Sequence, residues 1–488
     1  MKYQSTREAS AHIGAAEAIL RGIAPDGGLY VPESLEMSDF DARGAAEEKE
    51  YKALAVRVLS ALLPDVENMD ELVHRAYDGK FRADGEVSPL QSVGDRYVLE
   101  LFHGPTSAFK DVALSILPQF MTQSRAQRGE DGETLILTAT SGDTGKAAME
   151  GFCDVDGTRI IVFYPDSGVS AVQKAQMVTQ EGKNVCVCAV RGNFDDAQSG
   201  VKKIFSECAD GRFGKYGVEL SSANSINIGR LAPQVVYYFR AYGELMRMGK
   251  VQWGDAVDFC VPTGNFGNIL AGYIAMRMGL PVGRLVCASN ANDVLADFLE
   301  SGVYDRNRPF HKTISPSMDI LISSNLERLL YFAGGGSEVK DWMAQLAKDG
   351  RYRVSDAVRE HIAKYFAPGR CDDEKTCETI GKVWREHHYL CDTHTAVAWD
   401  VASRYIDEKR PMVVLSTASA YKFPAAVLGA IGGDLSGDEF DQMERLAELT
   451  GVPMPKNLCG LRTRTVRHES CIERGDMLDF VTQQVKRA

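Results

Sequence analysis

Short apolar runs that alternate with longer helical stretches are the feature that most restricts how this chain can fold. The predicted strands are residues 134–138, 159–163, 185–190, 256–261, 284–288 and 412–415. Helices are predicted after several of them, at residues 145–151, 170–180, 194–208, 269–278 and 420–428. Because these strands are almost continuously apolar, they are typical of parallel sheets that are covered on both faces. The pattern predicts an α/β fold.

The chain is long enough for more than one hydrophobic core. It has 488 residues, whereas single cores stop growing near ~250–300 residues. The first 95 residues contain helical patterns at 51–62 and 69–77 and few strand runs, and an acidic surface helix is expected within 435–449. We therefore expect three parts, which are a mostly helical N-terminal region (1–95), a large α/β domain (96–127 and 223–488) and a small α/β domain (128–222).

Charge and composition exclude several classes of protein. The chain has 55 Lys and Arg against 67 Asp and Glu, a net charge of −12, which disfavours a nucleic-acid partner. No apolar run reaches the ~18–20 residues of a membrane span, and no secretory signal is visible. The 11 cysteines are too dilute for a disulfide framework and predict reduced thiols. We expect a cytoplasmic protein, monomeric or homodimeric, without a membrane partner.

A glycine-containing turn joins the strand ending near Val261 to the next helix. Its sequence is Thr263-Gly264-Asn265-Phe266-Gly267-Asn268. Glycines at a strand-to-helix turn let backbone N–H groups converge, and the helix N-terminus adds partial positive charge, so the turn is suited to a phosphate. The spacing does not match the dinucleotide fingerprint. An ordinary tight turn would explain the same residues.

Two further loops carry polar groups at helix starts. Residues 139–146 have a strand–loop–helix context, but Thr140 stands where a P-loop needs glycine and Ala147 follows Lys146, so the P-loop interpretation fails. An N-capped helix or a carboxylate or phosphate site remains. Lys110 lies in the first turn of a helix predicted at 112–120, where the dipole does not favour a cation. It is either a surface lysine or a desolvated nucleophilic amine.

Hydroxyl, amide and guanidinium groups gather in three other segments. Residues 222–227 and Arg230, which precedes a helix predicted at 231–240, offer amides, hydroxyls and a guanidinium that can hold an oxyanion. Residues 392–396 read Asp-Thr-His-Thr-Ala, and residues 416–419 follow a strand at its carboxyl end, where open α/β sheets bind ligands. Helix caps and turns would also explain each segment.

Taken together, these segments resemble threonine synthases, a family of fold-type II pyridoxal-phosphate enzymes (tryptophan synthase β-like fold). The resemblance covers most of the chain. Besides the segments above, it rests on the motifs at residues 3–7, 22–32, 103–111, 292–294 and 315–319. It implies a lyase of amino-acid biosynthesis with pyridoxal 5′-phosphate as cofactor. The expected fold is two open α/β lobes with a helical N-terminal region.

The resemblance also implies roles for individual residues. Lys110 is expected to be the catalytic lysine that forms a Schiff base with the cofactor. The cofactor-binding residues implied are Lys110, Asp143, Gly264, Asn265, Phe266, Gly267, Asn268 and Thr417. Asp143 would lie near the 3′-oxygen of the cofactor, where many relatives carry Asn, and Thr417 would face the pyridine nitrogen. The substrate-binding residues implied are Thr140, Ser141, Thr144, Asn224, Ser225 and Arg230. No metal is implied.

The implied reaction converts O-phospho-L-homoserine and water into L-threonine and phosphate, by γ-elimination followed by addition of water. It requires two anion sites, one for each phosphate, and the sequence offers two candidates. A related pyridoxal-phosphate phospholyase or a threonine/serine dehydratase remains an alternative, and so does a non-catalytic phosphometabolite-binding protein. One departure concerns residues 419–423, Ser-Ala-Tyr-Lys-Phe, where many relatives have His-Pro-Ala-Lys-Phe. That histidine is absent here, while the Lys-Phe pair is kept as Lys422 and Phe423.

Overall fold

The predicted strands form two separate sheets in the computed structural model, which describes residues 1–7, 12–140, 142–167, 169–208 and 211–486. The larger sheet has the order β13 (Phe366–Arg370), β10 (Val282–Ser289), β9 (Val257–Pro262), β14 (Met412–Ser416), β4 (Arg96–Glu100) and β3 (Leu90–Val93). It is parallel except for β3, which pairs antiparallel with β4. The central strands β9 and β14 are buried throughout, as their apolar runs predict.

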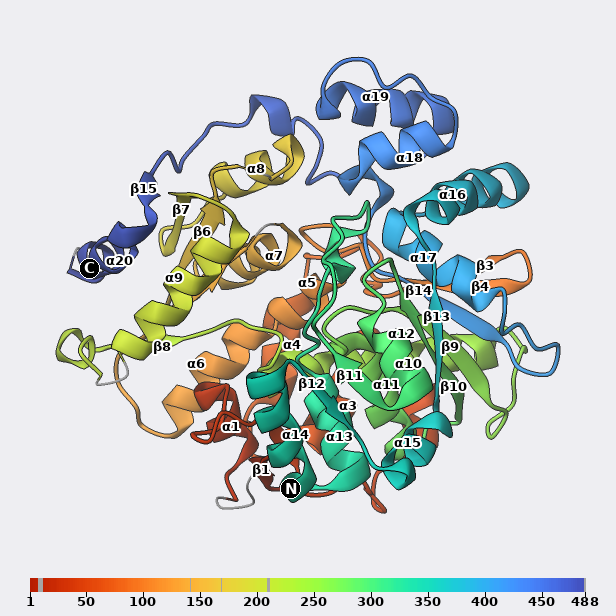
Figure 1. Cartoon of the computed structure of the whole chain (residues 1–488), viewed down its shortest axis with the longest axis horizontal. Helices are drawn as coiled ribbons and strands as arrows, with labels where there is room; N and C mark the ends of the chain where they lie inside the picture. Colours follow the sequence, from red (N-terminus) through yellow and green to blue (C-terminus); the bar gives the residue numbers. More distant parts are fainter. Residues whose placement is uncertain (8–11, 141, 168, 209–210, 487–488) are drawn as a thin grey trace.

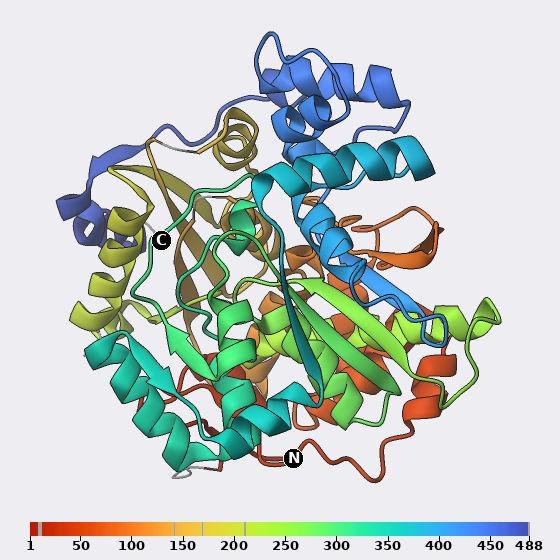
Figure 2. The same cartoon turned by 45° about the vertical axis from the view of Figure 1, so that its right-hand side comes forward.

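The smaller sheet lies beside the larger one (Figures 1 and 2). Its strands are all parallel, in the order β15 (Cys471–Glu473), β7 (Val185–Arg191), β6 (Thr158–Pro165), β5 (Glu133–Ala139) and β8 (Val218–Ser221). Its helices are α7 (Asp143–Phe152), α8 (Ala171–Val178), α9 (Phe194–Glu207) and the short η1 (Gly214–Tyr216). Two α/β units are therefore present, as predicted.

The C-terminal segment does not belong with the larger sheet, where residues 223–488 were expected. It crosses to the smaller sheet (Figure 1), and β15 pairs with β7 at the sheet edge. After η5 (Arg474–Asp476), the helix α20 (Met477–Lys486) buries Met477, Val481 and Val485 in the core of this unit. The expectation was wrong because a three-residue strand carries too little periodicity to show its pairing partner.

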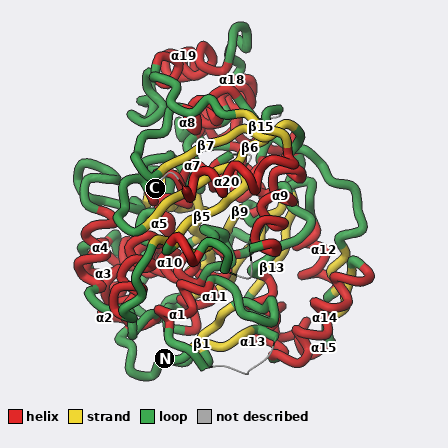
Figure 3. The backbone as a smooth tube through the Cα atoms, turned by 90° about the vertical axis from the view of Figure 1, so that its left-hand side faces the viewer, coloured by secondary structure: helices red, strands yellow, loops and turns green. Residues whose placement is uncertain are grey.

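The N-terminal region packs on the larger unit. It consists of β1 (Tyr3–Ser5), α1 (Ala15–Arg21), β2 (Tyr30–Pro32), α2 (Ala42–Glu47), α3 (Tyr51–Leu62) and α4 (Met69–Tyr77). The helices α1 to α4 lie together along one side of the molecule (Figure 3). Leu54 and Val58 share one core with Val235 and Phe239 of α10 (Ile228–Arg247), so this region shares the core of the larger unit.

Proline interrupts two helices that were predicted to be continuous. The helix expected at 112–120 is divided into α5 (Lys110–Leu114) and α6 (Leu117–Gln127), with Pro118 in the first turn of α6. The helix expected at 420–428 is divided into η3 (Ala420–Lys422) and α18 (Pro424–Ala430). Proline has no N–H to donate and disfavours helical backbone in the residue before it, so each helix restarts at or beside the proline.

The remaining elements cover the sheets or form the surface. They are α11 (Gly267–Arg277), α12 (Val294–Ser301), β11 (Val303–Asp305), η2 (Pro316–Met318), α13 (Leu326–Gly334), α14 (Gly336–Asp349), β12 (Arg351–Arg353), α15 (Asp356–Ala363), α16 (Asp373–His387), α17 (Thr393–Ala402), α19 (Glu439–Thr450) and η4 (Leu461–Thr463). The predicted acidic helix is α19. All 11 cysteines lie in the described residues as free thiols, as predicted. Over the same residues, no helix is long and apolar enough to span a membrane.

Candidate active site

Lys110 lies in a buried, charged environment near the carboxyl ends of strands β9 and β14. It begins α5 and exposes 11% of its side chain. Its Nζ atom lies 3.4 Å from the Ser317 hydroxyl and 3.7 Å from Oδ2 of Asp143. Burial lowers the pKa of Lys110, and the nearby Lys422 charge lowers it further, against the opposing effect of Asp143. A lysine of lowered pKa is a nucleophilic amine.

The segment after β14 is hydrogen-bonded to the residues that precede Lys110. The Phe109 N–H donates to the Thr417 carbonyl (2.8 Å), and the Ser419 N–H donates to the Ser107 carbonyl (3.0 Å). This short antiparallel pairing places Thr417, which is buried, next to the Lys110 backbone. Two residues that the sequence assigned to one cofactor are therefore neighbours.

Asp143 is the carboxylate nearest to Lys110. It is the first residue of α7, and its Oδ1 atom lies 2.5 Å from Nζ of Lys422. Burial raises the pKa of Asp143, but attraction by Lys422 and Lys110 outweighs that effect, so the pKa lies well below its ordinary value. The sequence indicated that Lys422 was retained in its motif, without a role.

The turn between β9 and α11 makes its closest approach at Gly264. A Cβ atom there would lie 2.8 Å from the Ser317 carbonyl oxygen, so only glycine fits without movement. At Gly267 an added Cβ would meet its nearest atom, Nδ2 of Asn325, at 3.4 Å, which is an ordinary contact. Within the chain, Gly264 therefore leaves no room for a side chain, whereas Gly267 has room for a Cβ atom. Phe266 has a left-handed backbone (φ 62°) and is the N-cap residue that precedes α11.

Asn268 also has a donor available in this turn. Its Oδ1 atom accepts a hydrogen bond from the Tyr237 hydroxyl (2.6 Å). Its Nδ2 atom is buried and has no partner among the described residues. Because an unpaired buried donor is costly, Nδ2 is suited to an acceptor that arrives from outside the chain.

Arg230 is a buried cation in the first turn of α10. Its Nη1 atom donates to the Ala223 carbonyl (2.8 Å), and its Nε atom has no partner. No ion pair within the described residues involves Arg230, and burial lowers its pKa to about 10. A buried guanidinium without an acidic partner favours an anionic ligand. Its sequence neighbours Asn224 and Ser225 are exposed and half-buried, respectively.

Asn325 connects the two loops that the sequence proposed as anion sites. Its N–H donates to the Asn265 carbonyl (3.1 Å), and its Nδ2 atom donates to the Ser225 carbonyl (3.2 Å). Arg328 is buried beside Asn325 and donates hydrogen bonds to Oδ1 of Asn325 and to the Ile226 carbonyl. The two loops are therefore adjacent. Sequence reasoning missed both connecting residues, because neither belongs to a motif it considered.

The loop after β5 holds the other predicted substrate residues. The Thr140 hydroxyl accepts from the N–H groups of Gly142 and Gly145, both at 3.0 Å, so it is engaged within its own loop. Thr144 is half-buried on α7. Ser141, also predicted here, lies outside the described residues.

His394 supports the site from α17. Its Nδ1 atom lies 2.7 Å from Oδ2 of Asp392, and its Nε2 atom accepts the Ser317 N–H (3.1 Å). Accepting at Nε2 fits the neutral tautomer that donates from Nδ1 to the carboxylate. His394 thereby holds Ser317 beside Lys110. The sequence singled out this motif but gave its histidine no role.

Three family models match the chain. They are a pyridoxal-phosphate dependent enzyme family over residues 92–418, the threonine synthase N terminus over 2–77 and the threonine synthase C-terminal family over 395–469. Threonine synthase of Pseudomonas aeruginosa is 41% identical over 434 residues, which cover 88% of this chain and 90% of that protein.

Solved structures agree with these matches. The PLP-bound threonine synthase of Brucella melitensis superposes with a TM-score of 0.88 and 40% identity, covering 100% of this chain and 99% of that one. Threonine synthase from yeast superposes with a TM-score of 0.87 and 34% identity, covering 99% and 98%. The chain belongs to the threonine synthase family. The predicted family, fold type and cofactor class are thereby confirmed.

The site of this threonine synthase family member fits pyridoxal phosphate. Lys110 offers an amine of lowered pKa, and Asn268, in the turn before α11, offers an unpartnered buried donor. These are the groups that an aldehyde and a phosphate need. Thr417, whose backbone is paired with the residue before Lys110, carries a neutral hydroxyl.

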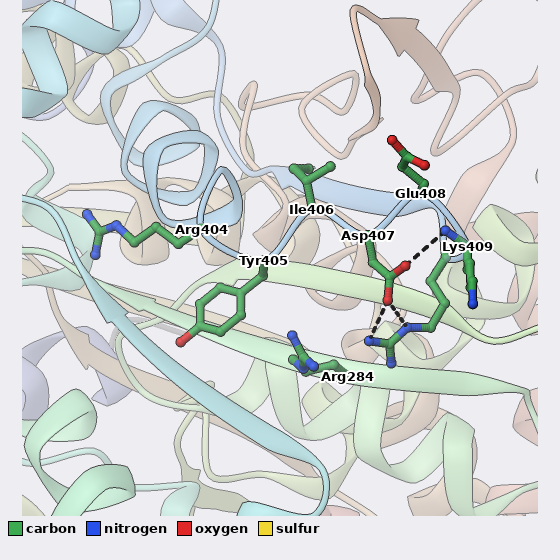
Figure 4. Close-up of a pocket in the computed structure, with 8 residues that line it drawn as sticks. Arg284, Arg404, Tyr405, Ile406, Asp407, Glu408 and Lys409 are labelled. Atoms are coloured by element: carbon green, nitrogen blue, oxygen red, sulfur yellow. Dashed lines mark hydrogen bonds and ion pairs between the residues drawn. The ribbon is translucent and has the colours of Figure 1, made fainter.

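A separate cavity of about 440 Å³ lies elsewhere (Figure 4). It is lined by Arg284 of β10 and by residues 404–410, which precede β14. It therefore adjoins the amino ends of the strands, whereas ligands in open α/β sheets bind at the carboxyl ends. Arg410 there is paired with Asp258 (3.3 Å) and Asp407 (3.2 Å). This cavity is distinct from the Lys110 site.

Proposed function

We propose that this protein is a threonine synthase that converts O-phospho-L-homoserine and water into L-threonine and phosphate. The observation that carries the proposal is a pair of adjacent loops near one buried lysine, each with a buried donor that has no partner among the described residues. One loop contains Gly264 and Asn268, and the other contains Arg230. A pyridoxal-phosphate enzyme acting on an unphosphorylated amino acid needs only the first loop. The second loop therefore favours a phosphorylated substrate over the dehydratase alternative.

Each residue has a proposed task. Gly264, Asn265, Phe266, Gly267 and Asn268 hold the cofactor phosphate, Thr417 faces the ring nitrogen and Asp143 faces the 3′-oxygen. Thr144, Asn224, Ser225 and Arg230 hold the substrate phosphate, Ser141 keeps its predicted substrate role, and Thr140 shapes their loop through its internal hydrogen bonds. When bound, pyridoxal phosphate stabilises negative charge on the substrate carbons that lose protons.

Lys110 is the proposed acid and base. Its lowered pKa makes Nζ give up a proton more readily than an ordinary lysine does, which suits a residue that must both release and take back a proton. Ser317 and Asp143, at 3.4 Å and 3.7 Å, keep this amine oriented. Burial of Asp143, Lys422 and Arg230 limits access of water and strengthens every charge interaction in the site.

Two measurements test the proposal. Purified enzyme supplied with O-phospho-L-homoserine should release threonine and phosphate in equal amounts. Formation of 2-oxobutanoate in place of threonine would identify a phospholyase instead. Borohydride reduction of the cofactor-loaded protein, followed by peptide mapping, should place the label on Lys110, and a label on Lys146 or Lys422 would contradict the assignment. A cytoplasmic location and a monomeric or homodimeric state stay predictions.

A further inference from the structure

Lys422 is a second lysine at the Lys110 site, and its side chain is fully buried. It ends η3, directly after the segment that pairs with residues 107–109. Its Nζ atom lies 2.9 Å from the Thr106 carbonyl oxygen and 2.5 Å from Oδ1 of Asp143. The Thr106 carbonyl is neutral. Within the described residues, Asp143 is the only acid that forms an ion pair with Lys422.

Asp143 is shared between the two lysines. Its Oδ1 atom contacts Lys422, while its Oδ2 atom lies 3.7 Å from Lys110 and 3.4 Å from the Ser317 hydroxyl. The Asp143 side chain is 3% exposed. Burying charges without partners is costly, so the carboxylate and the Lys422 ammonium depend on each other. The contact to Lys422 is the shorter of the two, which makes Lys422 the principal partner of Asp143.

We propose that Lys422 is a positioning residue that acts through Asp143: its buried ammonium holds the carboxylate in place and compensates its charge beside the reactive amine of Lys110. Lys110 has to move when its nitrogen is released from the cofactor. Lys422 carries no bond to the cofactor in this scheme, so it is the partner that keeps Asp143 oriented throughout. The inference rests on the cofactor being carried by Lys110.

The charges that face Lys110 determine how the amine responds to the loss of Lys422. Asp111 lies on the same helix, Asp143 on α7, Arg230 on α10 and Lys422 on η3. His394 on α17 also faces Asp143. Removal of Lys422 takes away a positive charge and leaves Asp143 to Lys110 alone. Both changes favour a proton on the Lys110 nitrogen.

The test follows the visible absorbance of the bound cofactor as a function of pH, without substrate. In Lys422→Met the midpoint of the titration should rise by about one pH unit or more, as expected for a change in close charge partners. In Lys422→Arg, which keeps the charge, it should stay near the wild-type value. In Asp143→Asn it should fall, and the double variant Asp143→Asn/Lys422→Met should lie between the two single variants.

Lys146→Met is the matched control. Lys146 is also a buried lysine, on the same helix as Asp143, but it contacts Glu150 and Gln180. Its loss should leave the midpoint unchanged. An unchanged or lowered midpoint in Lys422→Met, or an equal shift in Lys422→Arg, would overturn the proposal. If Lys422→Met does not retain cofactor, Lys422→Arg decides: retention at the wild-type midpoint supports the need for a buried cation beside Asp143, and loss of cofactor in both variants overturns it. Because no substrate is present, this result is independent of the proposed reaction.

Discussion

Replacement of Arg230 by methionine removes the guanidinium and keeps much of the apolar volume of the side chain. In the structure this cation is 4% exposed, with an unpartnered Nε and one hydrogen bond to the Ala223 carbonyl. If it binds the substrate phosphate, its loss removes a desolvated charge-assisted contact, which is comparable to an oxyanion donor of about 2–4 kcal/mol. At ~1.36 kcal/mol per decade, kcat/KM should fall roughly 30- to 1,000-fold.

Stability should respond differently from activity. Burial of a cation without an acidic partner is unfavourable, so its removal offsets the hydrogen bond lost at Ala223. The thermal midpoint of Arg230→Met should therefore stay within about 3 °C of the wild-type value. Cofactor absorbance should also be kept, because the cofactor phosphate is assigned to the other loop.

The assay measures phosphate release and threonine formation over a range of O-phospho-L-homoserine concentrations. Arg230→Lys is the control, since it keeps the charge and loses the two-pronged geometry, and it should have intermediate activity. Inorganic phosphate should inhibit the wild type more strongly than Arg230→Met. A variant with wild-type kcat/KM, or one that loses its cofactor, would refute the assignment of two anion sites.

Three other changes test the surrounding structure. Burial raises the pKa of Asp111 from 3.8 to about 6, although two hydrogen bonds from Thr106 act to lower it. The protonated carboxyl therefore stabilises the fold fully below pH ~4, and this contribution is lost as pH rises through ~6. Urea unfolding should accordingly show Asp111→Asn gaining about 2 kcal/mol relative to wild type between pH 4 and 7, and a pH-independent difference would contradict the burial argument. Gly264→Ala should weaken cofactor retention, because the added Cβ atom would lie 2.8 Å from the Ser317 carbonyl oxygen and displace the turn. Dialysis followed by absorbance measures the retention, and an unchanged value would mean that the turn does not hold the phosphate. Val481→Ala should lower the free energy of unfolding of the smaller unit by about 2 kcal/mol, since Val481 is fully buried there. No loss on denaturant titration would show that this side chain does not stabilise the unit.

Local patterns of the sequence determined the elements and the reactive residues. The apolar runs predicted β9 and β14 as buried parallel strands, because period and burial are written into successive residues. The turn after β9 and the setting of Lys110 carried enough motif information to identify the family, which the comparisons confirm. The helix breaks at Pro118 and Pro424 were also readable locally, although the continuous helices were predicted across them.

The tertiary structure alone decided which groups meet. Asp143 is held by Lys422, Ser317 is fixed by His394, and the two anion loops are joined by Asn325. Each pair comes from segments far apart in the chain, and its contact depends on how those segments pack in three dimensions rather than on any periodic pattern. The same reason explains why the pairing of β15 with β7 was not predicted, since three residues do not reveal the sheet that they join. A side chain's type is local information, but its neighbours, and therefore its charge state and its chemistry, are set by long-range packing.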